Sequence, residues 1–263
     1  MMRMSERISD PAASTRAPDV PAGSDHEVIW HDLECGSYVA DLPFWRTLAE
    51  SKGSPILDLG AGTGRVALDL ARRGHRVVAL DRDPRLLCEL RRRAGDLEIK
   101  TVLADARAFS LEARFALCLV PMQMVQLLDG EAGRAAMLGC VARHLQPGGM
   151  LAIAISPDLE RWSAADGGGI PLPDSCEQDG MLYFSQPTAV YVEGEGHVLE
   201  RRRETVSPAG LRTVEMDRIR LEHVRASQLE HEGAACGLIP AGRGNIPATP
   251  DYVSSEVVMF SAR

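Results

Sequence analysis

Short apolar segments alternate with amphipathic segments through the first half of the chain. Apolar runs at residues 56–59, 76–81, 97–103 and 115–120 predict buried strands of a parallel sheet. The stretches between them place apolar residues at helical spacing, and a further apolar run follows at residues 150–155. Because strands that alternate with helices form parallel sheets covered on both faces, this pattern predicts a doubly wound α/β fold.

Turn and cap residues mark the ends of the predicted helices. Val66 and Leu70 lie on one face of a helix that Gly74 is expected to end. Asp83 and Pro84 then suit the N-cap and the first position of the next helix, because an Asp side chain accepts a backbone N–H and Pro needs none. Each connection between the first three strands therefore contains a predicted helix, as parallel pairing requires.

The turn after the first strand carries the most informative motif, Asp58-Leu-Gly-Ala-Gly-Thr-Gly-Arg65. Glycines at alternate positions let a ligand approach the backbone closely, and the first N–H groups of the following helix point toward it. A dinucleotide-binding turn reads G-x-G-x-x-G, whereas here Arg65 takes the place of the third glycine. Asp58 would repel a pyrophosphate and attract an ammonium group.

This motif resembles the first motif of the class I S-adenosylmethionine-dependent methyltransferases, acid-x-G-x-G-x-G. The resemblance covers about residues 28–157, including Asp81, Asp105 and the sequence Leu-x-Pro-Gly-Gly at 145–149, and extends more loosely to the last strand. It implies a Rossmann-like doubly wound seven-stranded mostly parallel sheet with an antiparallel last strand. It also implies S-adenosyl-L-methionine as the cofactor.

The resemblance assigns roles to acids at or near the ends of the first three strands. Asp58 and the glycine backbone would hold the methionine end of the cofactor, Asp81 the ribose, and Asp105 with the next backbone N–H the adenine. Arg65 would pair with the cofactor carboxylate or lie in solvent. The predicted cofactor-binding residues are Asp58, Gly60, Ala61, Gly62, Gly64, Arg65, Asp81, Arg82, Asp105, Ala106, Val120 and Met122.

Residues 121–126 follow the fourth strand, at the switch point of the sheet, and should border the reacting centre. Gln123 and Gln126 there, and Tyr38 upstream, are the substrate-binding candidates; each has an alternative role in capping or packing. No catalytic residue is assigned, because the histidines at 31, 144 and 223 are isolated in the sequence and read better as structural or surface residues. Since an amine needs less help from a base than a hydroxyl, N-methylation is favoured slightly over O-methylation.

The second half of the chain departs from the alternating pattern. Residues 183–185, 189–192, 198–205 and 211–221 read as consecutive strands, which predicts a small antiparallel β insert over the carboxyl edge of the main sheet. A helix at 226–237, a Gly/Pro-rich loop at 239–250 and a last strand at 254–261 follow. The predicted domains are a disordered tail at 1–25 and one methyltransferase domain at 26–263, divided into a helical lid (26–50), a cofactor-binding core (51–157), a loop and insert (158–225) and closing elements (226–263).

Composition narrows the function. The net charge of −8 and the lack of an extended basic stripe argue against nucleic acid as a partner. The six cysteines show no metal-ligand spacing, so no metal is expected. No apolar run is long enough for a membrane span and no secretory signal is apparent, which predicts a cytoplasmic protein without membrane contact. The oligomeric state is open.

The sequence thus predicts a methyltransferase acting on a small molecule. Two alternatives remain open at this point. One is a catalytically silent protein of the same fold that binds S-adenosylmethionine or a partner. The other is a nicotinamide oxidoreductase, which the glycine spacing, Asp58 and the absence of a Tyr-x-x-x-Lys pair disfavour.

Overall fold

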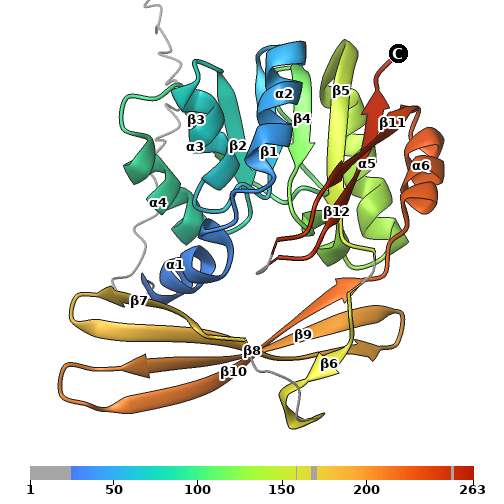
Figure 1. Cartoon of the computed structure of the whole chain (residues 1–263). Helices are drawn as coiled ribbons and strands as arrows, with labels where there is room; N and C mark the ends of the chain where they lie inside the picture. Colours follow the sequence, from blue (N-terminus) through green and yellow to red (C-terminus); the bar gives the residue numbers. More distant parts are fainter. Residues whose placement is uncertain (1–24, 158, 167–170, 250–251) are drawn as a thin grey trace, which may run out of the picture.

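A seven-stranded sheet forms the centre of the computed structural model, which describes residues 25–157, 159–166, 171–249 and 252–263 (Figure 1). Its strand order is β11-β12-β5-β4-β1-β2-β3, and only β12 runs antiparallel to its neighbours. The strands are β1 (Ile56–Leu59), β2 (Val77–Asp81), β3 (Ile99–Leu103), β4 (Phe115–Val120), β5 (Leu145–Ile155), β11 (Ile239–Ile246) and β12 (Ser255–Ser261).

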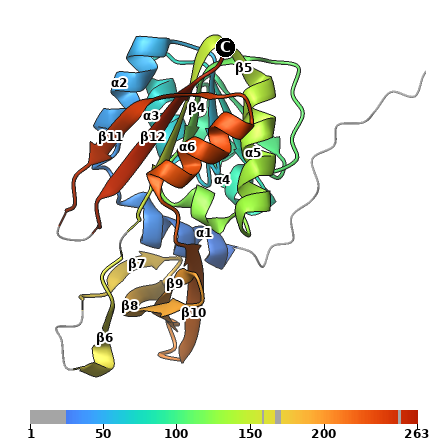
Figure 2. The same cartoon turned by 90° about the vertical axis from the view of Figure 1, so that its right-hand side faces the viewer.

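Helices cover both faces of this sheet. The helices α2 (Leu42–Lys52), α3 (Arg65–Arg72) and α4 (Pro84–Ala94) pack on one face, around the fully buried Trp45. The helices α5 (Glu131–His144) and α6 (Ala226–Ala235) pack on the other face (Figure 2). Phe260 is fully buried in the core on that side. Because both faces are buried, β1 and β4 read as continuous apolar runs apart from Asp58.

A second, five-stranded antiparallel sheet is inserted between β5 and α6. It lies beside the carboxyl ends of the parallel strands (Figure 1). Its order is β10-β9-β8-β6, with β7 paired to the same strand β8. The elements are β6 (Trp162–Ser163), the short 3-10 helix η3 (Ala164–Asp166), β7 (Asp174–Gln178), β8 (Met181–Glu193), β9 (Gly196–Val206) and β10 (Arg212–Glu222).

The N-terminal segment joins the two sheets. Helix α1 (Asp25–His31) and the π-helical turn η1 (Asp32–Gly36) lie between them (Figure 1). The carboxylate of Glu34 in η1 is buried and accepts two hydrogen bonds at 2.8 Å from Arg203 of β9, and one at 2.8 Å from the Ser185 hydroxyl of β8. The predicted lid is therefore attached to the insert as well as to the main sheet.

The predicted fold class is confirmed, including the antiparallel last strand and the separate antiparallel sheet. The predicted tail at 1–25 lies outside the described residues, except for Asp25, which begins α1. The expected loop at 239–250 is wrong over most of its length, since β11 occupies 239–246. Pairing with β12, with an irregularity between Pro240 and Gly242, outweighs the local preference of its glycines and proline.

Two further local features differ from what the sequence pattern suggests. Segments 183–185 and 189–192 form one strand, β8, whose register shifts between Pro187 and Ala189. Asp129 has the residue type of an N-cap and lies just before α5, but Gly130 is the N-cap of this helix; Asp129 has a φ of +58° and accepts a hydrogen bond from Arg107 instead. The bulge and the ion pair both depend on tertiary contacts that sequence spacing does not reveal.

Candidate functional site

The glycine turn after β1 is held against the end of β2. The backbone N–H groups of Gly60 and Ala61 donate to the carbonyl oxygen of Leu80, at 2.9 and 3.0 Å. The N–H of Gly62 donates to Oδ2 of Asp81 at 2.8 Å. The other carboxylate oxygen of Asp81, Oδ1, accepts from the N–H of Asp83 at 2.9 Å. Asp81 therefore fixes the position of the glycine turn, and each of its oxygens keeps a lone pair for a further donor.

Two side chains lie over the glycine turn. A Cβ atom added to Gly60 would stand 2.6 Å from Cγ of Met124, and one added to Gly62 would stand 2.4 Å from Nε2 of His31. Both glycines also have positive φ, +69° and +55°. Glycine is thus required at both positions by conformation and by close approach.

Gly62→Ala is expected to lower the free energy of unfolding by about 2 kcal/mol and to weaken S-adenosylhomocysteine binding about tenfold, because the new methyl strains the turn and displaces His31. Urea unfolding and calorimetry would measure the two effects. Gly74→Ala is the matched control, since Gly74 has a φ of +86° but no atom within 4 Å of an added Cβ. Equal losses in the two variants would contradict the role given to the His31 contact.

Asp58 lies inside the sheet, beneath the start of α3. Its side chain is buried, 1% exposed, and its Oδ1 atom has no hydrogen-bond partner among the described residues. Burial raises the pKa of Asp58 to about 7; Arg65 opposes this rise and Asp81 adds to it. An unpaired carboxylate oxygen in this position would be stabilised by a cationic or hydrogen-bonding group of a ligand.

Arg65 is engaged by the lid. Its guanidinium donates to both carboxylate oxygens of Asp41, at 2.5 and 2.8 Å, and to the carbonyl oxygen of Tyr38 at 2.7 Å. Trp45 donates to the same Asp41 carboxylate at 2.7 Å. The structure therefore places Arg65 in a buried ion pair that joins the lid to α3. The alternative of a solvent-exposed Arg65 is wrong, and its predicted contact with a cofactor carboxylate stays a prediction.

Asp105 follows β3 at the edge of the same site. Its carboxylate accepts hydrogen bonds from the backbone and the guanidinium of Arg107, which hold its pKa below the usual range. The residues Ala104 and Asp81 are joined by a backbone hydrogen bond of 3.0 Å, so the predicted adenine and ribose positions are adjacent. Ala106 is half-buried beside them, and Arg82 is exposed. The Arg107 contact was not foreseen, although an Asp-x-Arg sequence permits this turn.

Residues after β4 form the other side of the site. Val120 is fully buried, and Met122 has a φ of +53° and packs against the core on the α2–α4 side. Gln123 donates to the Ser156 hydroxyl at 2.8 Å. Gln126 is fully buried and donates to backbone carbonyl oxygens of Ser156 and Glu222, at 3.2 and 2.7 Å. Gln126 therefore ties the main sheet to the insert, whereas Gln123 lies closer to the surface.

Tyr38 is buried in contact with a residue that the sequence did not single out. Its ring lies 4.7 Å from that of Tyr252, and the hydroxyl groups of Tyr252 and Ser37 are 2.6 Å apart. Burial raises the pKa of both Tyr38 and Tyr252. Tyr252 is separated from Tyr38 by most of the chain, so no local pattern could have indicated the contact.

The three isolated histidines occupy different places. His31 covers the glycine turn, with its Nδ1 atom 3.4 Å from the Thr63 hydroxyl. His144 is buried away from the site, where its Nε2 accepts the N–H of Leu111 at 2.9 Å. His223 ends the insert, with its ring 6.0 Å from that of His197. Of the three, only His31 contacts the predicted cofactor-binding turn.

The described residues fit S-adenosylmethionine. Asp58 offers a buried carboxylate oxygen without a partner, and Asp81 offers free lone pairs next to Gly62. The turn between them is made of glycines that leave the backbone of Gly60 exposed. This arrangement can accommodate a ligand that carries an ammonium and vicinal hydroxyls and that approaches the backbone closely.

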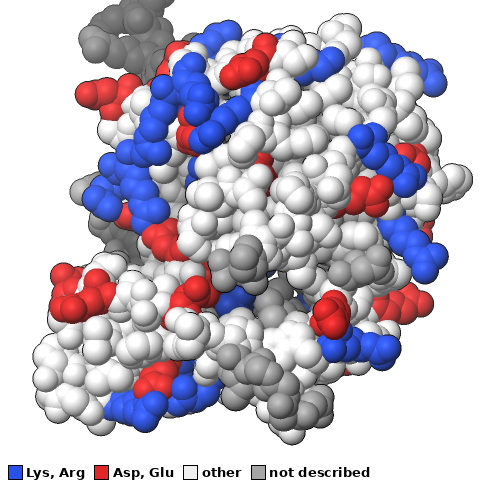
Figure 3. All heavy atoms as spheres, in the orientation of Figure 1, with Lys and Arg blue, Asp and Glu red and all other residues white. Residues whose placement is uncertain are grey.

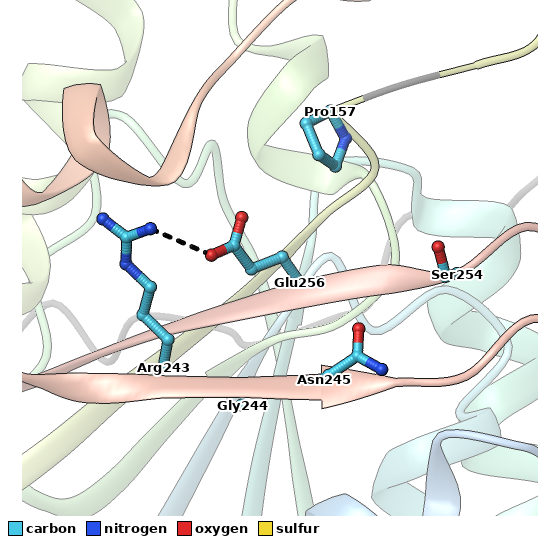
Figure 4. A pocket seen from close by; sticks show the side chains of 6 residues that line it. All are labelled: Pro157, Arg243, Gly244, Asn245, Ser254 and Glu256. Carbon is cyan, nitrogen blue, oxygen red and sulfur yellow. Dashed lines mark hydrogen bonds and ion pairs between the residues drawn. The ribbon is translucent and has the colours of Figure 1, made fainter.

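A pocket of about 480 Å³ lies elsewhere, beyond the end of β5. It is lined by Pro157, by residues of β11, by Ser254 just before β12 and by Glu256 in β12, and Arg243 pairs with Glu256 at 3.2 Å (Figure 4). None of the predicted site residues lines it. Arg243 is also paired with Glu230 at 2.7 Å, so the main charge in this pocket is already balanced.

The described residues include neither a metal-binding cluster nor a membrane-spanning helix. Among them, no group of three or more His, Cys, Asp or Glu side chains is arranged to hold a metal ion. Likewise, no helix in the described part of the chain has the length and apolar character needed to cross a membrane.

Sequence comparison identifies related proteins over the first half of the chain. The family described as "Methyltransferase domain" matches residues 56–149. Cypemycin N-terminal methyltransferase from Streptomyces sp. is 34% identical over 97 residues, which are 37% of this chain and 40% of the relative. Ribosomal RNA small subunit methyltransferase A from Anaeromyxobacter dehalogenans is 37% identical over 103 residues, 38% of this chain and 33% of the relative. The matched segment thus spans well under half the length of these relatives.

Structural comparison extends the likeness to nearly the whole chain. The sugar N-methyltransferase KedS8 from Streptoalloteichus sp. superimposes with a TM-score of 0.71. The superposition covers 98% of this chain and 100% of that protein, at 18% sequence identity. The second sheet is therefore part of the shared fold.

Proposed function

We propose that the chain is a class I S-adenosylmethionine-dependent methyltransferase that transfers a methyl group to the amine nitrogen of a small molecule; the match of residues 56–149 to a methyltransferase domain supports this. The observation that carries this proposal is the glycine turn fixed by Asp81 beside the unpaired oxygen of Asp58. S-adenosylmethionine, when bound, supplies an electrophilic methyl group on a sulfonium. The chain's own residues then have to bind the cofactor and the acceptor, orient them toward each other and exclude water.

Each predicted residue takes a binding role in this proposal. Asp58 would hold the cofactor's ammonium, Asp81 its ribose hydroxyls, and Asp105 with the N–H of Ala106 its adenine. Gln123 and Tyr38 would border the acceptor. The lid closed by the Arg65–Asp41 pair would keep water from the reacting atoms.

The side chains around the carboxyl edge favour an amine over a phenol or alcohol. Both Tyr38 and Tyr252 have a raised pKa, so they stay protonated at neutral pH and are poor bases. Gln123 and Ser156 are neutral and hydrogen-bonded to each other. An amine that reaches this site unprotonated needs no base for the transfer itself. The names of cypemycin N-terminal methyltransferase and of the sugar N-methyltransferase KedS8 also support nitrogen as the acceptor.

The test combines binding with transfer. Calorimetry should detect S-adenosylmethionine and S-adenosylhomocysteine with dissociation constants on the order of micromolar, and no NAD(H). Methyl-labelled S-adenosylmethionine should then label amino sugars or peptide N-termini but not matched hydroxyl compounds. Excess S-adenosylhomocysteine is the control, because it should suppress the transfer.

Three outcomes would contradict parts of the proposal. Labelling of the hydroxyl compounds alone would show that the chain methylates oxygen and not nitrogen. Binding of both cofactor forms without transfer to any acceptor would support a catalytically silent protein. Binding of NAD(H) instead would overturn the assignment of the cofactor.

A further inference from the structure

Arg201 stands on the inner face of the insert, the face turned toward the lid. Its neighbour on the same face, Arg203, reaches across to Glu34 of η1, and residues two apart on a strand point the same way. Arg202, between them, points to the opposite face, where it pairs with Glu204 at 2.6 Å. The strand therefore presents two arginines to the space between the sheets and one to the outside.

The hydrogen-bonding groups of the two inner arginines are used differently. Arg203 donates Nε and Nη2 to Glu34 and lies 3.2 Å from Asp217 through Nη1. By contrast, the Nε and Nη1 atoms of Arg201 are buried and have no hydrogen-bond partner among the described residues. Buried guanidinium donors are rarely left unpaired, because they lose water without a replacement.

The residue directly opposite Arg201 does not supply the missing acceptor. Asp217 of β10 is its cross-strand partner in the register. Its Oδ1 atom is paired with Arg203, and its Oδ2 atom is buried without a partner among the described residues. The two side chains thus leave both a donor set and an acceptor open on one face, an arrangement that a bound molecule would complete.

Arg201 faces the site of the proposed reaction. Its charge is close enough to oppose the burial-driven rise in the pKa of Tyr252 and of Cys35. The ring of Tyr252 contacts that of Tyr38, whose carbonyl oxygen accepts a hydrogen bond from Arg65 at the start of α3. In the space-filling view a hollow opens between the two sheets, with basic atoms visible inside it (Figure 3).

We propose that Arg201 binds an oxyanion of the methyl acceptor, either a carboxylate or a phosphate, and so selects anionic amines as substrates. This inference rests on the proposed function, since it assumes that the acceptor enters between the sheets. A guanidinium suits both groups because its planar donors match two oxygens at once. Asp217, next to it, would accept a hydroxyl or ammonium of the same molecule.

The test observes the Arg201 side chain directly. The full chain, saturated with S-adenosylhomocysteine, would be titrated with inorganic phosphate and separately with acetate at constant ionic strength. The Nε–Hε signal of Arg201, identified by its loss in Arg201→Gln, should shift in a saturable way with a dissociation constant on the order of millimolar. A response to phosphate alone would indicate a phosphorylated acceptor, and a response to acetate alone a carboxylate.

Two variants serve as controls. Arg202→Gln removes a neighbouring charge from the opposite face and should leave the Arg201 shift unchanged. Arg201→Lys keeps the charge without the planar donors, and phosphate should then bind about tenfold more weakly, by competition with a labelled anion. If Arg201 simply pairs with Asp217 in solution, neither anion will shift its signal, and the inference is overturned. Calorimetry of S-adenosylhomocysteine on the same sample separates this failure from a failure of the proposed function.

Discussion

Asp81→Ala is expected to weaken S-adenosylhomocysteine binding by about 3 kcal/mol, roughly a hundredfold or more, with methyl transfer lost to the same extent at low cofactor concentration. The variant removes the acceptor proposed for two ribose hydroxyls. It also removes the partner of the Gly62 N–H, so the glycine turn is no longer fixed to the end of β2. Calorimetry would give the affinity, and urea unfolding would show how much of the loss comes from a disordered turn.

Asp83→Ala is the matched control for this variant. Asp83 lies two residues further on and caps α4 by accepting the N–H of Arg85 at 2.8 Å. Its replacement should cost about 1 kcal/mol of stability and leave binding unchanged, because its backbone N–H still donates to Asp81. Equal losses of affinity in the two variants would contradict the ribose assignment and point to a general weakening of the β2–α4 connection.

Local patterns were sufficient to predict the core of the fold. Apolar runs fixed the parallel strands because both faces of that sheet are buried, and Asp83 with Pro84 placed the start of α4. β11 was missed because its glycines and proline favour a loop, and its strand conformation depends on pairing with β12. β6 and β7 were missed because they gain their structure from β8.

In the candidate site, too, the local features could be predicted and the tertiary contacts could not. The glycine turn and Asp81 could be predicted because they are neighbours along the strand–turn–helix pattern, and the structure joins them through the Gly62 N–H. The residues that contact Arg65, Asp105 and Tyr38 could not be predicted from the sequence. Asp41 lies in the lid, and Tyr252 lies near the end of the chain. The open donors of Arg201 also needed the structure, because an Arg-Arg-Arg sequence on a strand does not tell which side chain is paired.

Asp58→Asn is expected to remove a pH dependence of stability that Asp58 causes. The pKa of Asp58 is about 7 in the folded protein because burial disfavours its charged form, whereas its ordinary value is 3.8. Between these values the folded state holds more protons than the unfolded state, so the free energy of unfolding falls as pH rises toward 7 and changes no further above it. Asn cannot ionise. Its stability relative to the wild type should therefore increase by about 2–3 kcal/mol between pH 5 and pH 8, measured by urea unfolding.

The same substitution tests what Asp58 does for the cofactor. If the ionised carboxylate holds the ligand's ammonium, wild-type affinity for S-adenosylhomocysteine should rise about tenfold from pH 6 to pH 8, since each unit of pKa shift on binding corresponds to that factor. In Asp58→Asn this rise should disappear, because Asn carries no ionisable group. The compound 5′-methylthioadenosine lacks the ammonium and should bind independently of Asp58. A wild-type rise that persists unchanged in the variant would show that Asp58 serves the fold and not the ligand.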